Sequence, residues 1–184
     1  MSNLVAGTLL IAEPFLKDPN FLRTVVLLCE HQQVEGSFGF IINKETGLTL
    51  ADYMNEMEDL PLPVFLGGPV ENNTLHFLHC NPKEIPGGQQ IIDGVYWGGD
   101  FEMAIMGLRK GLIKPHQIRF YLGYSGWSEG QLEEEMEDQT WLTVTANMDI
   151  IFHTKTDDIW KASLKLMGSS YEGLANYPID PQLN

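Results

Sequence analysis

The stretch TVVLLCEHQQVEGSFGFIIN, residues 24–43, decides the fold. It holds two apolar, β-branched runs, residues 24–31 and 37–43, with a turn at Glu35 and Gly36 between them. Short apolar runs bounded by turn residues predict strands, and two such runs joined by a short connection predict an antiparallel hairpin. We expect residues 24–31 to form a central, buried strand.

Further strands and helices are expected on both sides of this hairpin in the sequence. Segments in which apolar residues alternate with polar ones are followed by segments in which apolar residues recur at helical spacing. Thr49, Asp100 and Ser128 stand where helix N-caps belong, and Gly111 stands where a helix ends. The strands are expected at residues 7–12, 64–66, 74–80, 89–97, 118–124 and 141–145, and the helices at residues 49–60, 100–110, 128–138 and 157–167. We predict one α/β (α+β) domain over residues 1–184 with a mixed sheet, and a docked tail at residues 169–184.

The charge of the chain excludes several partners. Its 184 residues hold 11 Lys and Arg against 25 Asp and Glu, a net charge of −14. Proteins that bind nucleic acids neutralise several phosphates with basic side chains, and anionic membranes select the same property. The densest basic group, Arg109, Lys110, Lys114 and Arg119, is typical of a helix C-terminus. We therefore expect neither direct nucleic-acid binding nor membrane binding.

The cysteines and the N-terminal region favour a cytoplasmic protein. Cys29 follows an apolar run and is expected to be a buried small hydrophobe. Cys80 follows a different strand, and two cysteines in a chain of this length do not indicate a disulfide framework. The first residues lack the positive start of a signal peptide, and no apolar stretch approaches 18 residues.

Three groups of side chains resemble catalytic or metal sites. The carboxylates of residues 129–138 are expected to fan round a solvated helix face. His76 and His79 lie three residues apart on an expected strand, so their side chains point to opposite faces, and zinc needs three or four ligands. Cys29 and His31 share a strand face, but a nucleophilic thiol needs exposure. We prefer the structural explanation for each, and assign no catalytic residue, no metal ligand and no cofactor.

The glycine-rich corners are the remaining candidates. Gly123-Tyr124-Ser125-Gly126-Trp127 resembles the nucleophile elbow G-x-S-x-G, except that Trp127 replaces the last glycine. We expect residues 122–131 and 95–101 to form strand–loop–helix corners, where backbone N–H groups can approach an anion. Acidic residues already occupy both helix starts, so a tight turn is preferred. We expect the Trp127 ring to pack on Leu132, with a pocket wall as its second role.

Several strings, in order, resemble one family of bacterial proteins. The matching strings are Pro14, Leu16, Asp18, Pro19, Phe21 and Arg23, then VVLLCEH with Gly36, Gly39 and Asn43, then Gly67-Gly68-Pro69-Val70, then GYSGWSEGQLE with Trp141-Leu142-Thr143, and last Phe152, Thr154 and Trp160. Over residues 7–168 the chain resembles the AlgH/YqgE family. The resemblance implies a bent, mixed sheet that forms a partial barrel flanked by helices. Members are described as transcriptional regulators or as proteins of unknown function.

Two functional hypotheses follow. The first is a non-enzymatic regulatory or binding protein that acts through a protein or small-molecule partner and does not contact DNA. The second is an enzyme or small-molecule-binding protein whose site combines loop residues. Relatives often have alanine at the position of Ser125, which argues against a serine nucleophile. The candidate ligand-binding residues are Arg23, Asn43, Gly67, Gly68, Pro69, Tyr124, Ser125, Gly126 and Trp127. Convergence of Arg23, Asn43 and residues 123–127 on one cleft would favour ligand binding or catalysis, and scattering of these residues would favour a protein-interaction surface.

Overall fold

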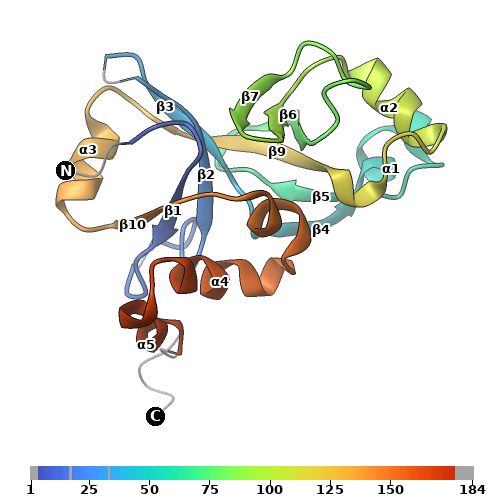
Figure 1. Ribbon diagram of the computed structural model, residues 1–184. Helices are drawn as coiled ribbons and strands as arrows, with labels where there is room; N and C mark the ends of the chain where they lie inside the picture. The colour runs from blue at the N-terminus through green and yellow to red at the C-terminus, as the bar shows by residue number, and fades with distance from the viewer. Residues whose placement is uncertain (1–3, 17, 33, 177–184) are drawn as a thin grey trace.

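A single strongly curved sheet forms a half-barrel at the centre of the molecule, with helices packed outside it (Figure 1). The computed structural model describes residues 4–16, 18–32 and 34–176. The expected α+β domain with a bent, mixed sheet is confirmed: one strand pair is parallel and the other pairs are antiparallel. The expected docking of residues 169–184 stays a prediction, because residues 177–184 lie outside the described residues.

The strand order of the main path is β10-β1-β2-β3-β9-β6-β8-β7, and β5 joins it by pairing parallel to β9. The expected hairpin of β2 and β3 is present and antiparallel. Within the described ranges the strands are β1 (Thr8–Ala12), β2 (Val25–Gln32), β3 (Gly36–Ile41), β4 (Glu45–Thr49), β5 (Pro63–Leu66), β6 (Val70–His79), β7 (Gln89–Ile92), β8 (Val95–Trp97), β9 (Ile118–Trp127) and β10 (Trp141–Thr145).

The helices are short and cover the outside of the half-barrel, with α1 and α2 at one end and α3 at the other (Figure 1). Asp100 caps α2 as expected, since its carboxylate accepts a hydrogen bond from the Met103 backbone, and Gly111 follows the helix with φ +69°. The described helices and helical turns are α1 (Leu50–Tyr53), η1 (Asn55–Met57), α2 (Phe101–Arg109), η2 (Pro115–Gln117), α3 (Gln131–Glu137), η3 (Asp149–His153), η4 (Thr156–Asp158), α4 (Ile159–Leu166), η5 (Ser169–Tyr171) and α5 (Glu172–Ala175).

Three apolar clusters hold the layers together. The first joins one face of β1, β2, β3 and β9 to α4 and includes Phe40, Tyr121 and Trp160. The second fills the space between β6, β9 and α2. The third lies under α3 and includes Trp127 and Trp141. Each strand of the β2–β3 hairpin contributes side chains to two clusters, because successive side chains point to opposite faces of the sheet.

The helix expected over residues 49–60 is wrong. The cap between Thr49 and Asp52 forms, but α1 ends after one turn because Met54 is extended. The chain then turns so that the Glu56 carbonyl and the Asp59 carboxylate accept hydrogen bonds from Arg109 of α2. A tertiary contact has overridden the local helical pattern.

The loop expected directly after Tyr124 is also wrong, because residues 125–127 continue β9. Ser37 and Gly39 of β3 pair with Trp127 and Ser125, which extends the strand beyond the expected end at Tyr124. Helix α3 then begins at Gln131, three residues later than Ser128 predicts, with Gly130 at φ +74° before it. The expected Ser128–Gln131 contact still forms, through two hydrogen bonds to the Gln131 amide oxygen.

Candidate functional site

Gly123 sets the geometry of the candidate site. Tyr121 and Tyr124 both pack against the first cluster, although residues three apart on a regular strand point to opposite faces. Gly123 lies between them with φ +64°, and this irregularity exchanges the two faces of the strand. A Cβ atom at Gly123 would lie 2.7 Å from the carbonyl oxygens of both Gly68 and Val70. Glycine is therefore required where Tyr124 turns toward the inner face of the sheet.

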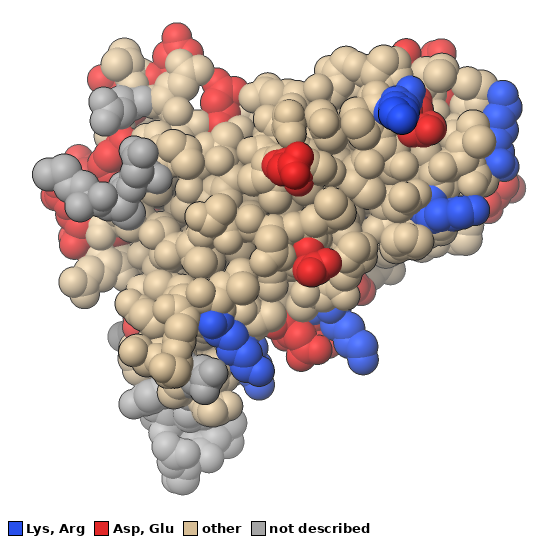
Figure 2. All heavy atoms as spheres, in the orientation of Figure 1, with Lys and Arg blue, Asp and Glu red and all other residues tan. Residues whose placement is uncertain are grey.

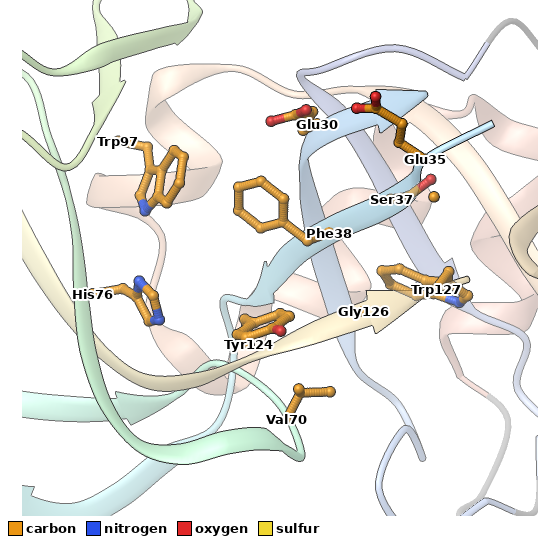
Figure 3. A pocket seen from close by; sticks show the side chains of 11 residues that line it. Glu30, Glu35, Ser37, Phe38, Val70, His76, Trp97, Tyr124, Gly126 and Trp127 are labelled. Carbon is orange, nitrogen blue, oxygen red and sulfur yellow. The ribbon is translucent and has the colours of Figure 1, made fainter. Parts of the chain in front are cut away.

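A cavity of about 570 Å³ opens beside Tyr124 (Figure 3). Five aromatic side chains line it. Trp127 is buried at its edge, and the other four come from four strands: Phe38 of β3, His76 of β6, Trp97 of β8 and Tyr124 of β9. We call these four residues the ring box. All four side chains are only partly buried, whereas the Phe40 ring beneath them is fully buried.

The four rings form a closed circuit. The centroid of Phe38 lies 4.7 Å from that of Trp97 and 6.1 Å from that of Tyr124. The His76 centroid lies 6.4 Å from Trp97 and 6.0 Å from Tyr124. Phe40 is 5.2 Å from His76, 6.0 Å from Phe38 and 6.3 Å from Trp97, so it forms the floor.

The electrostatic character of the cavity is acidic. Glu30 and Glu35 of the β2–β3 hairpin line its rim, and its lining contains no Lys or Arg. Burial lowers the pKa of His76, while the nearby Glu71 opposes that shift, so the imidazole is neutral at pH 7. The buried Nε2 atom of His76 has no hydrogen-bond partner among the described residues.

Arg23 and Asn43 lie together, but not at this cavity. The Asn43 amide accepts a hydrogen bond from the Val25 N–H at 2.8 Å and donates one to the Arg23 carbonyl at 2.9 Å. The Arg23 guanidinium carbon lies 4.7 Å above the Trp160 ring. Asn43 therefore joins two backbone segments, and its exposed side faces a separate polar groove with Glu45. The cleft that was expected to favour ligand binding or catalysis, with both residues beside 123–127, does not form.

Gly67 and Gly68 lie behind the ring box and position it. The Gly67 carbonyl accepts a hydrogen bond from the Ser125 hydroxyl at 3.1 Å. A Cβ atom at Gly68 would lie 2.2 Å from the carbonyl carbon of Tyr124, so the chain crosses β9 in direct backbone contact. Pro69 follows on the surface. Ser125 is fully buried with its hydroxyl already used, which is not the setting of a nucleophile.

Gly126 and Trp127 reach both sides of β9. Gly126 lines the cavity, and Trp127 lines its edge while its ring is 6% exposed in the cluster that holds Leu132. The Trp127 indole donates to Glu135 at 2.8 Å, and the Trp141 indole donates to the same oxygen at 2.7 Å. Glu135 thus accepts hydrogen bonds from two buried indoles, a structural role that the interpretation of residues 129–138 as a solvated helix face did not predict. No sequence signal points to these tertiary partners.

The cysteines and His79, the other candidate catalytic or metal-binding residues, do not form a site with His76. Burial raises the pKa of the Cys29 thiol far above its usual range, so the thiolate is disfavoured. Cys29 and Cys80 are both free thiols. His79 is buried, with one ring nitrogen 2.9 Å from the Gly98 carbonyl, on the face opposite His76. Among the described residues no three His, Cys, Asp or Glu side chains are grouped as metal ligands.

No helix in the described ranges combines the length and apolar character needed to cross a bilayer.

Comparison with known proteins identifies the family. The family model described as AlgH-like matches residues 9–172. The chain belongs to the AlgH-like family. A UPF0301 protein of Cytophaga hutchinsonii is 43% identical over 182 residues, which covers 98% of this chain and 100% of the relative. A UPF0301 protein of Chlorobium luteolum is 42% identical, with 98% and 95% covered.

Solved structures agree with this membership. The solution structure of the AlgH protein from Pseudomonas aeruginosa superposes with a TM-score of 0.75 at 27% identity, and the match covers 97% of this chain and 96% of that one. A crystal structure of a Corynebacterium diphtheriae protein gives a TM-score of 0.76 at 18% identity, with 96% and 94% covered, and shows the shared fold. The AlgH-like half-barrel is thus common to all three chains.

Proposed function

We propose that this AlgH-like protein is a non-enzymatic, cytoplasmic binding protein of regulatory type whose small-molecule or side-chain ligand occupies the ring box. One observation carries the proposal: four aromatic side chains from four strands surround an open cavity of about 570 Å³. Ligand pockets in proteins range from about 300 to 1,000 Å³ and are mostly lined by apolar and aromatic groups. Partly exposed rings at the mouth of a barrel are typical of such pockets.

Charge distribution supports a partner other than nucleic acid. On the face that Figure 2 shows, the basic side chains lie apart from one another, with acidic side chains near several of them. Of the basic group expected near the end of α2, Arg109 is paired with Asp59 at 2.7 Å. The Arg119 guanidinium lies over the Phe65 ring at 4.8 Å. These cations are engaged within the protein, which leaves few to neutralise phosphates. The two free thiols support a reducing compartment.

A fragment screen tests the proposal. Ligand-observed NMR of the wild-type protein against a small library of flat and cationic fragments should give hits that contact the ring box. The variant Phe38→Ala removes one wall and should lose these hits. Phe21→Ala is the matched control, because Phe21 is also half-buried but packs on Trp141 in the third cluster, with ring centroids 5.4 Å apart.

The result contrary to the proposal is equally clear. If the wild-type protein yields no hits, or if the same hits bind Phe38→Ala as tightly as the control variant, the cavity is not the binding site. Thermal melting of all three proteins checks that loss of binding does not reflect loss of folding.

A further inference from the structure

The ring box gathers four aromatic rings beside one open cavity. Its four sides measure 4.7, 6.4, 6.0 and 6.1 Å between neighbouring centroids. These are the separations of aromatic rings in contact with one another, so a cation in the cavity beside them can lie within the ~6 Å reach of cation–π attraction of more than one ring. Trp97 supplies the ring type that attracts cations most strongly.

The surroundings of the box favour a positive charge. Glu30 and Glu35 place carboxylates at the rim, and the lining carries no cation that would compete with a ligand. His76 does not oppose a cation, because burial keeps its imidazole neutral. Figure 3 shows both glutamates on the hairpin side of the box, with Phe38 between them and Tyr124. The whole chain, at −14, attracts cations over a longer range.

The walls also select the type of cation. Rings form the four sides and Phe40 packs against three of them, while the carboxylates of Glu30 and Glu35 stand at the rim and not among the rings. A primary ammonium is compact and strongly hydrated, and it loses those water contacts in such a site. A trimethylammonium group is weakly hydrated and apolar at its surface, and it is the group that aromatic cages recognise.

We infer that the ring box of Phe38, His76, Trp97 and Tyr124 binds a trimethylammonium group that has no carboxylate next to it. This inference rests on the proposed function and specifies the ligand class of the same cavity. The shared chemistry is found in a free choline-like molecule and in a trimethylated lysine side chain of a protein. Both place the cation among the rings and the rest of the ligand toward Glu30 and Glu35.

The decisive experiment compares two probes of one shape. Choline and 3,3-dimethylbutan-1-ol differ by nitrogen against carbon, so only choline is charged. The ¹⁵N–¹H signal of the Trp97 indole, assigned with Trp97→Phe, reports occupancy of the box during each titration. We expect choline to bind at least about tenfold more tightly than the alcohol. Glycine betaine should bind more weakly than choline, because its carboxylate meets those of Glu30 and Glu35.

Variants separate the ring from simple apolar contact. Trp97→Leu keeps an apolar side chain but removes the ring, and it should weaken choline by about fivefold or more while changing the affinity for the alcohol by less than about twofold. Because this variant lacks the Trp97 signal, its affinities are measured by calorimetry. Tyr96→Leu is the control on the other face of β8, where Tyr96 stacks on His79, and should leave choline binding unchanged. Glu35→Gln, at an exposed position, should weaken choline at low salt more than at high salt.

The outcomes distinguish failure of the cation inference from failure of the proposed ligand-binding function. If the alcohol binds as tightly as choline, or if neither probe moves the Trp97 signal, the cation inference is wrong, while the fragment screen decides separately whether the cavity binds ligands at all. If choline binds preferentially, a peptide with one trimethyllysine identifies the source. Tighter binding of this peptide than of choline indicates a protein partner, and the reverse order indicates a free metabolite.

Discussion

Truncation of Trp127 tests the main structural conclusion about β9. Trp127→Ala removes a ring that is 6% exposed and stands edge-to-face with Trp141 at 6.2 Å. Loss of a buried aromatic ring costs about 4 kcal/mol of unfolding free energy. In a domain of this size each kcal/mol lowers the melting temperature by about 2–4 °C, so we expect a fall of about 8–16 °C.

A second substitution separates ring burial from the hydrogen bond. Trp127→Phe keeps most of the ring but loses the N–H donated to Glu135 at 2.8 Å. Glu135 is half-buried and keeps its bond from Trp141, so the expected cost is about 2 kcal/mol, half that of Trp127→Ala. Urea unfolding followed by far-UV circular dichroism measures both values. A melting temperature of Trp127→Ala within about 2 °C of wild type would refute the reasoning, and would leave a binding role for this ring as the better explanation.

Three further predictions concern other parts of the molecule. Gly123→Ala should cost about 2–4 kcal/mol of unfolding free energy, because a Cβ atom there meets two carbonyl oxygens at 2.7 Å. Gly130→Ala should cost only about 1 kcal/mol, because Gly130 shares a positive φ of +74° but has open space around it. Equal losses for the two variants in urea unfolding would contradict this explanation. Cys29 should react with a thiol reagent only after unfolding, since burial raises its pKa, and the intact mass should show no loss of two protons through a bond to Cys80. Gel-shift assays at ~150 mM salt should show no sequence-specific DNA complex, and sub-micromolar binding to one sequence would overturn the charge argument.

Features of the fold that depend on residues close in sequence can be predicted from this sequence, and features that depend on tertiary contacts cannot. The β2–β3 hairpin and the Asp100 cap of α2 are visible in the sequence because each depends on residues a few positions apart. The glycines of residues 123–127 suggest a turn, and only the pairing of Tyr124 with β6 and of residues 125–127 with β3 keeps the chain extended there. The ring box has one signal in the sequence, Tyr124 in the glycine-containing string of residues 123–127.

Its other members could not be found in this way. Phe38, His76 and Trp97 lie on three separate strands, and each has an ordinary place in an apolar or alternating pattern. Their convergence depends on the strand order β3-β9-β6-β8, which local periodicity does not specify. The same limit explains Arg23 and Asn43, which the family resemblance singles out: the Asn43 amide accepts from the Val25 N–H and donates to the Arg23 carbonyl, away from the cavity.

The place of β1 between β2 and β10 has a consequence for biosynthesis. Ala12 pairs with Trp141, and its carbonyl accepts the Trp160 indole N–H at 3.0 Å. A ribosome that adds about 5–20 residues per second makes Trp141 roughly 6–26 s after Ala12. During that interval the nascent chain carries an apolar strand with one open edge, a known starting point for aggregation. Chaperone dependence and sensitivity to C-terminal truncation should therefore follow from these two late contacts of β1, with β10 and with Trp160.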